Sequence, residues 1–224
     1  KNKNGETRVV QQMLDVLNVK GSVLTMDALH CQTETLKKIA DKKAHVVVQV
    51  KKNQPNLWNA VNTQFQAVFD AGKEKVVTEV TQQAHERKEQ RKVYQLKPKF
   101  NETLKARWPS IRSIIAVERH RTIKEKTSID TSFYISSMSP RHKSLGHYIR
   151  QHWRIENSQH YVLDVVFKED NSRIMLEGAV ENMALFRRFV MNILKQCECG
   201  APSQRNKLKK AGWNDDYRAQ VFFG

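Results

Sequence analysis

Two short apolar runs with a helical segment between them constrain the fold of this chain more than any other feature. The first run, "SVLTMDA" at residues 22–28, ends at Asp27; the second, "HVVVQVKKN" at residues 45–53, is rich in β-branched residues and too short for a helix. Between them, residues 33–43 have the apolar spacing of an amphipathic helix. Strand, helix and strand with short connections predict a right-handed βαβ unit with a parallel pair, and therefore an α/β fold.

The middle of the chain changes to a pattern that is typical of antiparallel strands. Residues 75–138 contain four stretches rich in β-branched and aromatic residues, separated by charged or polar turns, which predict a sheet with one wet face. Helical periodicity follows, and the last residues resemble a loosely attached basic tail. We therefore divide the chain into residues 1–70, 71–139, 140–200 and 201–224.

A large excess of basic side chains indicates a polyanionic partner. The chain has 39 Lys and Arg residues against 23 Asp and Glu residues, a net charge of +16. Residues 85–126 alone hold 13 basic and 5 acidic side chains. Nucleic acid is the usual partner of such a segment, although a well-solvated basic surface would have the same composition. No apolar run is long enough for a membrane span, so no membrane partner is expected.

The cysteine content and the first residues favour a cytosolic protein that is longer than these 224 residues. Cys31, Cys197 and Cys199 lack the paired spacing of a zinc site, and we expect them to be reduced thiols. The chain begins at Lys1 with a polar segment, which suggests the middle of a longer protein.

Glu156 lies on the apolar face of a helix predicted over residues 142–167. A spacing of 100° per residue places it in one stripe with Ile149, Trp153, Leu163 and Phe167. A carboxylate on a core-facing stripe lowers the free energy of unfolding unless another group compensates its charge. Asp27 is a candidate neighbour, because open α/β sheets place their sites at the carboxyl ends of strands. An aspartate at that position can equally be a turn former or a helix cap.

The two carboxylates would form a metal site if the helix packs beside the strand that ends at Asp27. Mg²⁺ takes oxygen ligands of this kind. A rival interpretation is a zinc site within the helix, because four residues follow one another at intervals of four: His152, Glu156, His160 and Asp164. Each of these residues is rotated by about 40° around the helix axis relative to the one before, so only adjacent members can bind the same metal ion. Ligand hardness favours Mg²⁺, with His160 as a partner that orients a ligand or as a core histidine.

Absent motifs narrow the chemistry further. The chain has no GxxxxGK[ST] loop, no GxGxxG after a strand and no GxSxG elbow. ATP-driven, dinucleotide-dependent and serine-hydrolase mechanisms therefore have no support.

Several longer motifs resemble DDE transposases of bacterial insertion sequences, in the H-repeat-associated subgroup. They are "VLTMDALHCQ", "VVVQVKKNQPNL", "FYISSM" and "HWRIENSQHYVLDVVFKED", in the order that the family has. The resemblance implies a ribonuclease-H-like core, with its N-terminal strands missing here, a β-rich insertion and C-terminal helices that complete the core. It also implies that Asp27 is the second catalytic Asp and Glu156 the catalytic Glu, and that both bind Mg²⁺ or Mn²⁺ for DNA strand cleavage and transfer.

The same resemblance implies partners and a location. Double-stranded DNA, at the element ends and at the target, is the expected substrate, and a homodimer is an open alternative to a monomer. The expected location is the bacterial cytoplasm, in association with the nucleoid. By charge and position, the candidate DNA-binding residues are Lys51, Lys52, Arg87, Lys88, Arg91, Arg150, Trp153 and Arg154.

The chain departs from the family pattern in two ways. The family's first Asp belongs on a strand well upstream of the second, whereas the one earlier aspartate here, Asp15, lies in a predicted helix. Related transposases also carry a Tyr-x2-Arg-x3-Glu-x6-Lys signature, and here Ile149, His152 and Leu163 stand in the places of its Tyr, Arg and Lys. We therefore expect a transposase catalytic domain that is incomplete as given. The alternatives are a catalytically dead DNA-binding remnant or regulator and a zinc-dependent hydrolase.

Overall fold

The computed structural model of the chain describes two compact units, Lys1–His152 and Trp153–Gly224. The backbone is described over residues 3–84, 87–200 and 203–224; within these ranges, seven side chains are not described, those of Lys3, Asn4, Ala84, Arg87, Glu156, Asn157 and Glu177. No helix within these ranges is both long and apolar enough to cross a membrane.

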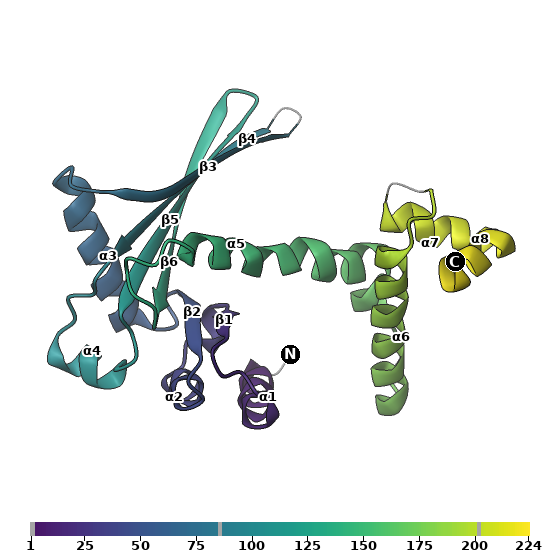
Figure 1. The fold of residues 1–224 in the computed structure, drawn as a ribbon, viewed down its shortest axis with the longest axis horizontal. Helices are drawn as coiled ribbons and strands as arrows, with labels where there is room; N and C mark the ends of the chain where they lie inside the picture. Colours follow the sequence, from purple (N-terminus) through teal and green to yellow (C-terminus); the bar gives the residue numbers. More distant parts are fainter. Residues whose placement is uncertain (1–2, 85–86, 201–202) are drawn as a thin grey trace. The chain divides into compact units, whose positions relative to one another are not determined.

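The first unit is built on one six-stranded sheet in the order β1-β2-β6-β5-β4-β3 (Figure 1). Strands β1 (Val23–Met26) and β2 (His45–Val50) are parallel and are connected through α2 (Thr33–Asp41), so the predicted βαβ unit is confirmed. The predicted antiparallel strands are also confirmed, as β3 (Val76–Ala84), β4 (Arg87–Leu96), β5 (Ser113–Ile123) and β6 (Lys126–Ser136). Because β6 pairs with β2, all six strands form one sheet, as expected of a mixed α/β fold.

Four of the strands continue past the parallel pair as a projecting arm. Strand β6 pairs with β2 only from Phe133 to Ser136, and the last pair is Val50 with Phe133 at the carboxyl end of β2. The strand segments beyond that pair are called the distal arm; they comprise residues 78–84, 87–93, 117–123 and 126–132. Figure 1 shows these strands running upward beyond the ends of β1 and β2. The arm therefore extends from the same edge of the sheet as the carboxyl ends of the parallel strands.

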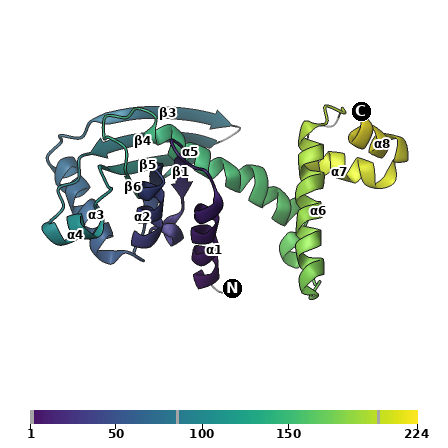
Figure 2. The same ribbon diagram turned by 60° about the horizontal axis from the view of Figure 1, so that its bottom comes forward.

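Helices cover both faces of the central sheet (Figure 2). On one face, α3 (Pro55–Asp70) buries three apolar side chains, and the Phe65 ring stacks on Phe133 of β6 at a centroid distance of 5.8 Å. On the other face, α5 (Leu145–Ile155) approaches β4 so closely that a Cβ on Gly146 would lie 3.0 Å from Val93 Cγ2. This close approach accounts for a glycine in that helix. The remaining elements of the unit are α1 (Lys3–Val16), α4 (Glu102–Arg107) and a 3₁₀ turn (Ala28–His30).

The second unit corrects the prediction of one regular helix up to Phe167. The α-helical bonding of α5 ends at Ile155, and π-helical turns follow over Glu156–His160 and Val162–Val166. The i→i+5 bonds of a π-turn change the angle between successive side chains, so a stripe calculated at 100° per residue does not hold beyond Ile155. Leu163 is buried, but its cluster contains Met191 of α6 (Glu177–Gln196).

The end of the chain corrects two further expectations. Residues beyond 202 are not a loose tail, since α7 (Gln204–Trp213) and α8 (Asp215–Phe223) pack on the end of α6 through a cluster that includes Leu194, Tyr217 and Val221. Reduced thiols are wrong for Cys197 and Cys199, which a disulfide joins. Their Cα atoms are 5.3 Å apart, within the range that a disulfide spans. Cys31 is a free, buried thiol, as expected.

Candidate active site and DNA-binding surface

Asp27 lies directly after β1, at the carboxyl end of the parallel pair, where the sequence predicts a site. Its side chain is 52% exposed, and its Oδ1 accepts a hydrogen bond of 3.1 Å from the backbone N–H of Leu29. Asp27 is thus the N-cap of the 3₁₀ turn, which is the structural role that an aspartate at a strand end often has. The cap uses one carboxylate oxygen. Oδ2 makes no hydrogen bond or ion pair with the residues that the structure describes, and it is suited by chemistry to bind a hard divalent cation.

The His30 imidazole lies near both Asp27 and a second carboxylate. Its Nε2 lies 3.9 Å from Asp27 Oδ1 and 3.8 Å from Glu6 Oε1 on α1. The imidazole is largely buried, whereas both carboxylates are more than half exposed. The histidine therefore supports the loop that holds Asp27, while the carboxylate of Asp27 remains open to solvent.

Helix α5 reaches β1 beside Asp27. His152 Nδ1 lies 3.3 Å from the hydroxyl oxygen of Thr25, which is two residues before Asp27 and therefore on the same face of the strand. His152 is four residues before Glu156, which opens the π-helical turn. The side chain of Glu156 lies outside the described part of the structure, so its role as the partner of Asp27 stays a prediction.

The helical zinc ladder is not supported by the geometry. His152 is in the α-helical part and His160 at the end of a π-turn, so the interval of four residues no longer places their side chains one above the other. Both His160 and Asp164 are exposed. Among the described side chains, no group of three or more His, Cys, Asp or Glu residues is arranged to hold a metal ion.

The predicted DNA-binding residues are spread over both units. Lys51 and Lys52 are exposed after β2, and the Lys52 ammonium lies 5.6 Å from the centre of the Trp58 ring. Arg91 is half-buried and Lys88 exposed on β4, whereas the side chain of Arg87 is outside the described part. On α5, Arg150 and Trp153 are half-buried and Arg154 is exposed. Lys88 and Arg91 lie on opposite faces of β4, and the contacts of all these residues with DNA stay predictions.

One group on the distal arm was missed by the sequence reasoning. The Glu89 carboxylate of β4 is 8% exposed and forms ion pairs with Arg91 and, at 3.7 Å, with Arg121 of β5. Arginines at alternate positions of a strand share a face, so "ERKEQR" and "ERHR" carried a signal for such a group. The signal becomes specific only once the pairing of β4 with β5 is known.

A second acidic group lies on the opposite face of the same strands. The Tyr94 hydroxyl donates a 3.0 Å hydrogen bond to the Glu118 carboxylate, and His120 Nε2 lies 3.3 Å from that carboxylate. Burial, together with this hydrogen bond, raises the pKa of the Tyr94 phenol well above its ordinary value. Glu118 is therefore already engaged within the arm.

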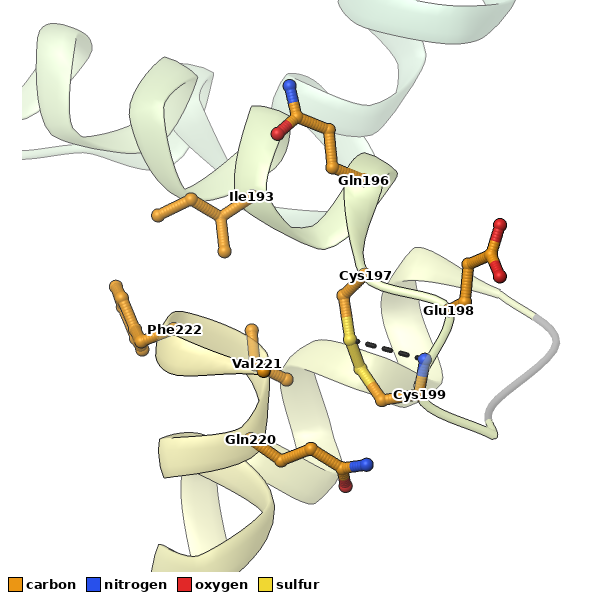
Figure 3. Close-up of a pocket in the computed structure, with 9 residues that line it drawn as sticks. Ile193, Gln196, Cys197, Glu198, Cys199, Gln220, Val221 and Phe222 are labelled. Carbon is orange, nitrogen blue, oxygen red and sulfur yellow. Dashed lines mark hydrogen bonds between the residues drawn. A yellow bond between two sulfur atoms is a disulfide. The ribbon is translucent and has the colours of Figure 1, made fainter.

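The second unit has a pocket of about 580 Å³ between the ends of α6 and α8. Figure 3 shows Ile193 across from Val221 and Phe222, with the disulfide of Cys197 and Cys199 at one side. The Glu198 carboxylate points away from this hollow (Figure 3). The lining offers no group of acids or bases for catalysis.

Comparison with known proteins places these features in a family. The sequence pattern of the family described as "Transposase DDE domain" matches residues 1–193. The chain is 31% identical over 224 residues to "Putative transposase YncI" of Escherichia coli O157:H7, covering 98% of this chain and 57% of that protein. It is 27% identical to "H repeat-associated putative transposase YhhI" of Escherichia coli K12, covering 99% of this chain and 60% of that protein. The chain thus spans less than two thirds of the length of these relatives, and it belongs to the transposase DDE domain family.

Proposed function

We propose that the chain is part of a transposase catalytic domain that binds double-stranded DNA and supplies Asp27 and Glu156 as two metal-binding catalytic carboxylates. The observation that carries the proposal is the half-exposed Asp27 carboxylate at the carboxyl end of β1, in a chain whose family match covers residues 1–193. The contact of His152 with Thr25 supports it, because this contact holds α5 against β1 one turn before Glu156. In this proposal β1, β2 and α5 belong to a ribonuclease-H-like core.

The residues would act on DNA through Mg²⁺ or Mn²⁺. A bound divalent ion supplies charge neutralisation at the phosphodiester and activates the attacking oxygen. Asp27 would bind such an ion through Oδ2, while Oδ1 stays bonded to the Leu29 N–H and fixes the direction of the carboxylate. Glu156 would provide a second oxygen ligand. Cleavage and joining at the ends of an insertion sequence, in the bacterial cytoplasm, is the reaction that we propose for the site.

Two carboxylates alone are a weak site for Mg²⁺. This ion demands near-octahedral coordination and keeps most of its water when few protein ligands are present. Asp15, the remaining aspartate before Asp27, is engaged elsewhere, since Lys38 Nζ lies 2.6 Å from its Oδ2. We therefore propose that these 224 residues bind DNA but do not cleave it by themselves.

A nicking assay tests this proposal. The 224-residue protein is incubated with supercoiled plasmid and Mn²⁺, beside a double variant with Asp27→Asn and Glu156→Gln. We expect both proteins to bind the plasmid and neither to nick it above background. Nicking by the unmodified protein that the double variant lacks would contradict incompleteness and support the catalytic assignment. Nicking that the double variant retains would contradict the assignment itself.

A further inference from the structure

The two faces of the distal arm carry different net charges. In an antiparallel pair, residues directly opposite each other point to the same face, and successive residues alternate. Of the residues whose side chains are described, the register places six charged ones on the face of Val93 and Val117, here called the arginine face: Glu89, Arg91, Arg119, Arg121, Lys126 and Asp130. The opposite face, here called the lysine face, has Glu79, Lys88, Lys92 and Glu118. Among the described side chains of these strands, the arginine face has four cations against two carboxylates, whereas the charges of the lysine face balance.

The guanidinium groups of the arginine face have hydrogen-bonding capacity to spare. The Glu89 carboxylate forms ion pairs with Arg91 and Arg121, which lie on neighbouring strands, and so fixes the position of both guanidinium groups. Arg119 lies opposite Arg91 and Asp130 in the register and makes no ion pair with any residue of the described ranges. The Nε atoms of all three arginines are buried, and none has a hydrogen-bond acceptor in the described part of the protein. The three side chains are nevertheless partly exposed, and Arg91 and Arg121 are 28% and 38% exposed. The exposed ends of these guanidinium groups can reach phosphate, which accepts two parallel N–H bonds from one arginine.

The arginine face continues the face of the sheet that carries Asp27. Thr25 pairs with Val47, Val47 with Ser136, and Ser136 with Ser113, so these residues share one face. From Ser113 to Arg119 is six residues along β5, roughly 20 Å at the rise of a strand. Asp27 is two residues beyond Thr25 and therefore level with Ile115, so the last four residues of this span, roughly 14 Å, lead outward from the edge at which Asp27 lies. One turn of duplex DNA is about 34 Å long, so one duplex could contact both places.

We propose that the arginine face of the distal arm binds the phosphate backbone of the double-stranded DNA on which the Asp27 site acts. Arg119 is a direct phosphate ligand, and Glu89 is a positioning residue that holds Arg91 and Arg121 towards the same backbone. The proposal rests on the proposed function, because it assumes that DNA is the substrate. It adds the face of the arm that meets the DNA and residues whose contact the sequence reasoning did not foresee.

Two single variants with the same change in charge test the choice of face. One carries Arg119→Ala, and the matched control carries Lys92→Ala. The affinity of each 224-residue protein for a fluorescent DNA duplex is measured by anisotropy over a range of salt concentrations. We expect the arginine-face variant to bind about tenfold more weakly and its log–log salt slope to become less steep by about 0.9 for each lost contact. The lysine-face variant should keep the affinity and slope of the unmodified protein.

The fold of each variant is checked by thermal unfolding. Arg119→Ala breaks no ion pair among the described residues, and Arg119→Gln replaces it if that variant unfolds. Equal losses for both faces, or a larger loss for the lysine face, overturn this proposal while DNA binding itself stands. A preference for single-stranded RNA over the duplex, or no salt-dependent binding by the unmodified protein, overturns the proposed function together with it.

Discussion

Raising the salt concentration from 50 to 200 mM is expected to weaken binding of duplex DNA by about 10³- to 10⁵-fold, which corresponds to six to ten phosphate contacts. The cause is the release of counterions from the DNA as lysine and arginine side chains neutralise phosphates. The number of contacts follows from the basic segment 85–126, together with Lys51 and Lys52 after β2.

Fluorescence anisotropy with a labelled duplex measures this effect directly. A duplex of unrelated sequence is the control, and it should give the same slope because phosphate contacts carry no sequence information. An affinity that changes by less than about tenfold over this range would mean that far fewer phosphates are contacted than the charge implies.

The thiol of Cys31 is expected to react with a disulfide reagent such as DTNB roughly a thousandfold more slowly than an ordinary cysteine at pH 8. Burial raises its pKa from 9.0 to about 12, and the nearby Arg107 offsets only part of that rise. The thiolate is the reacting form, so its fraction at pH 8 falls about tenfold for each unit by which the pKa rises. The reaction should stay slow until the pH approaches 12, unless the protein unfolds first.

The same reagent also counts thiols. Without reductant, unfolding in guanidinium should release one reactive thiol per chain, because Cys197 and Cys199 are joined. Cys31→Ser should abolish that signal. Fast reaction of the folded protein would contradict a core position for Cys31, and three thiols after unfolding would contradict the disulfide.

Local signals in the sequence were sufficient for the βαβ unit. The runs before Asp27 and after His45 are apolar, short and separated by one helix, and handedness leaves a single arrangement for such a unit. The alternation in β3 to β6 was equally local. The sequence does not reveal the register of the strands. The pairing of β6 with β2, and the extension of the arm from the carboxyl edge, depend on contacts between distant segments.

Two predictions are wrong because one depends on a regular helical pattern and the other on a weak apolar pattern. The stripe through Glu156 assumed α-helical geometry, and π-turns begin at that residue. The basic segment after Pro202 resembled a tail because apolar residues are sparse there. Its two helices nevertheless had visible N-caps, since Ser203 accepts a bond from the Asn206 N–H and Asn214 one from the Tyr217 N–H.

The candidate site was predictable only in part, for a similar reason. Asp27 follows from its place after an apolar strand, and the structure places it at the carboxyl end of β1. The apolar stripe predicts Glu156 only under α-helical geometry, which its π-turn departs from, so the prediction of Glu156 now rests on the family resemblance. The group around Glu89 required the pairing of β4 with β5, which no local pattern reveals.

Iron-directed cleavage of the protein backbone tests most directly whether Asp27 and Glu156 share one metal ion. Fe²⁺ takes the place of Mg²⁺, and with ascorbate and peroxide it generates hydroxyl radicals that cut the chain close to the ion. The proposed function predicts cuts near both residues, competition by Mg²⁺ and loss of both cuts in Asp27→Asn. The control variant Asp15→Asn, which removes a carboxylate that is paired with Lys38, should cut like the unmodified protein. Cuts near only one of the two residues, or cuts at Glu156 that persist in Asp27→Asn, would contradict a shared site.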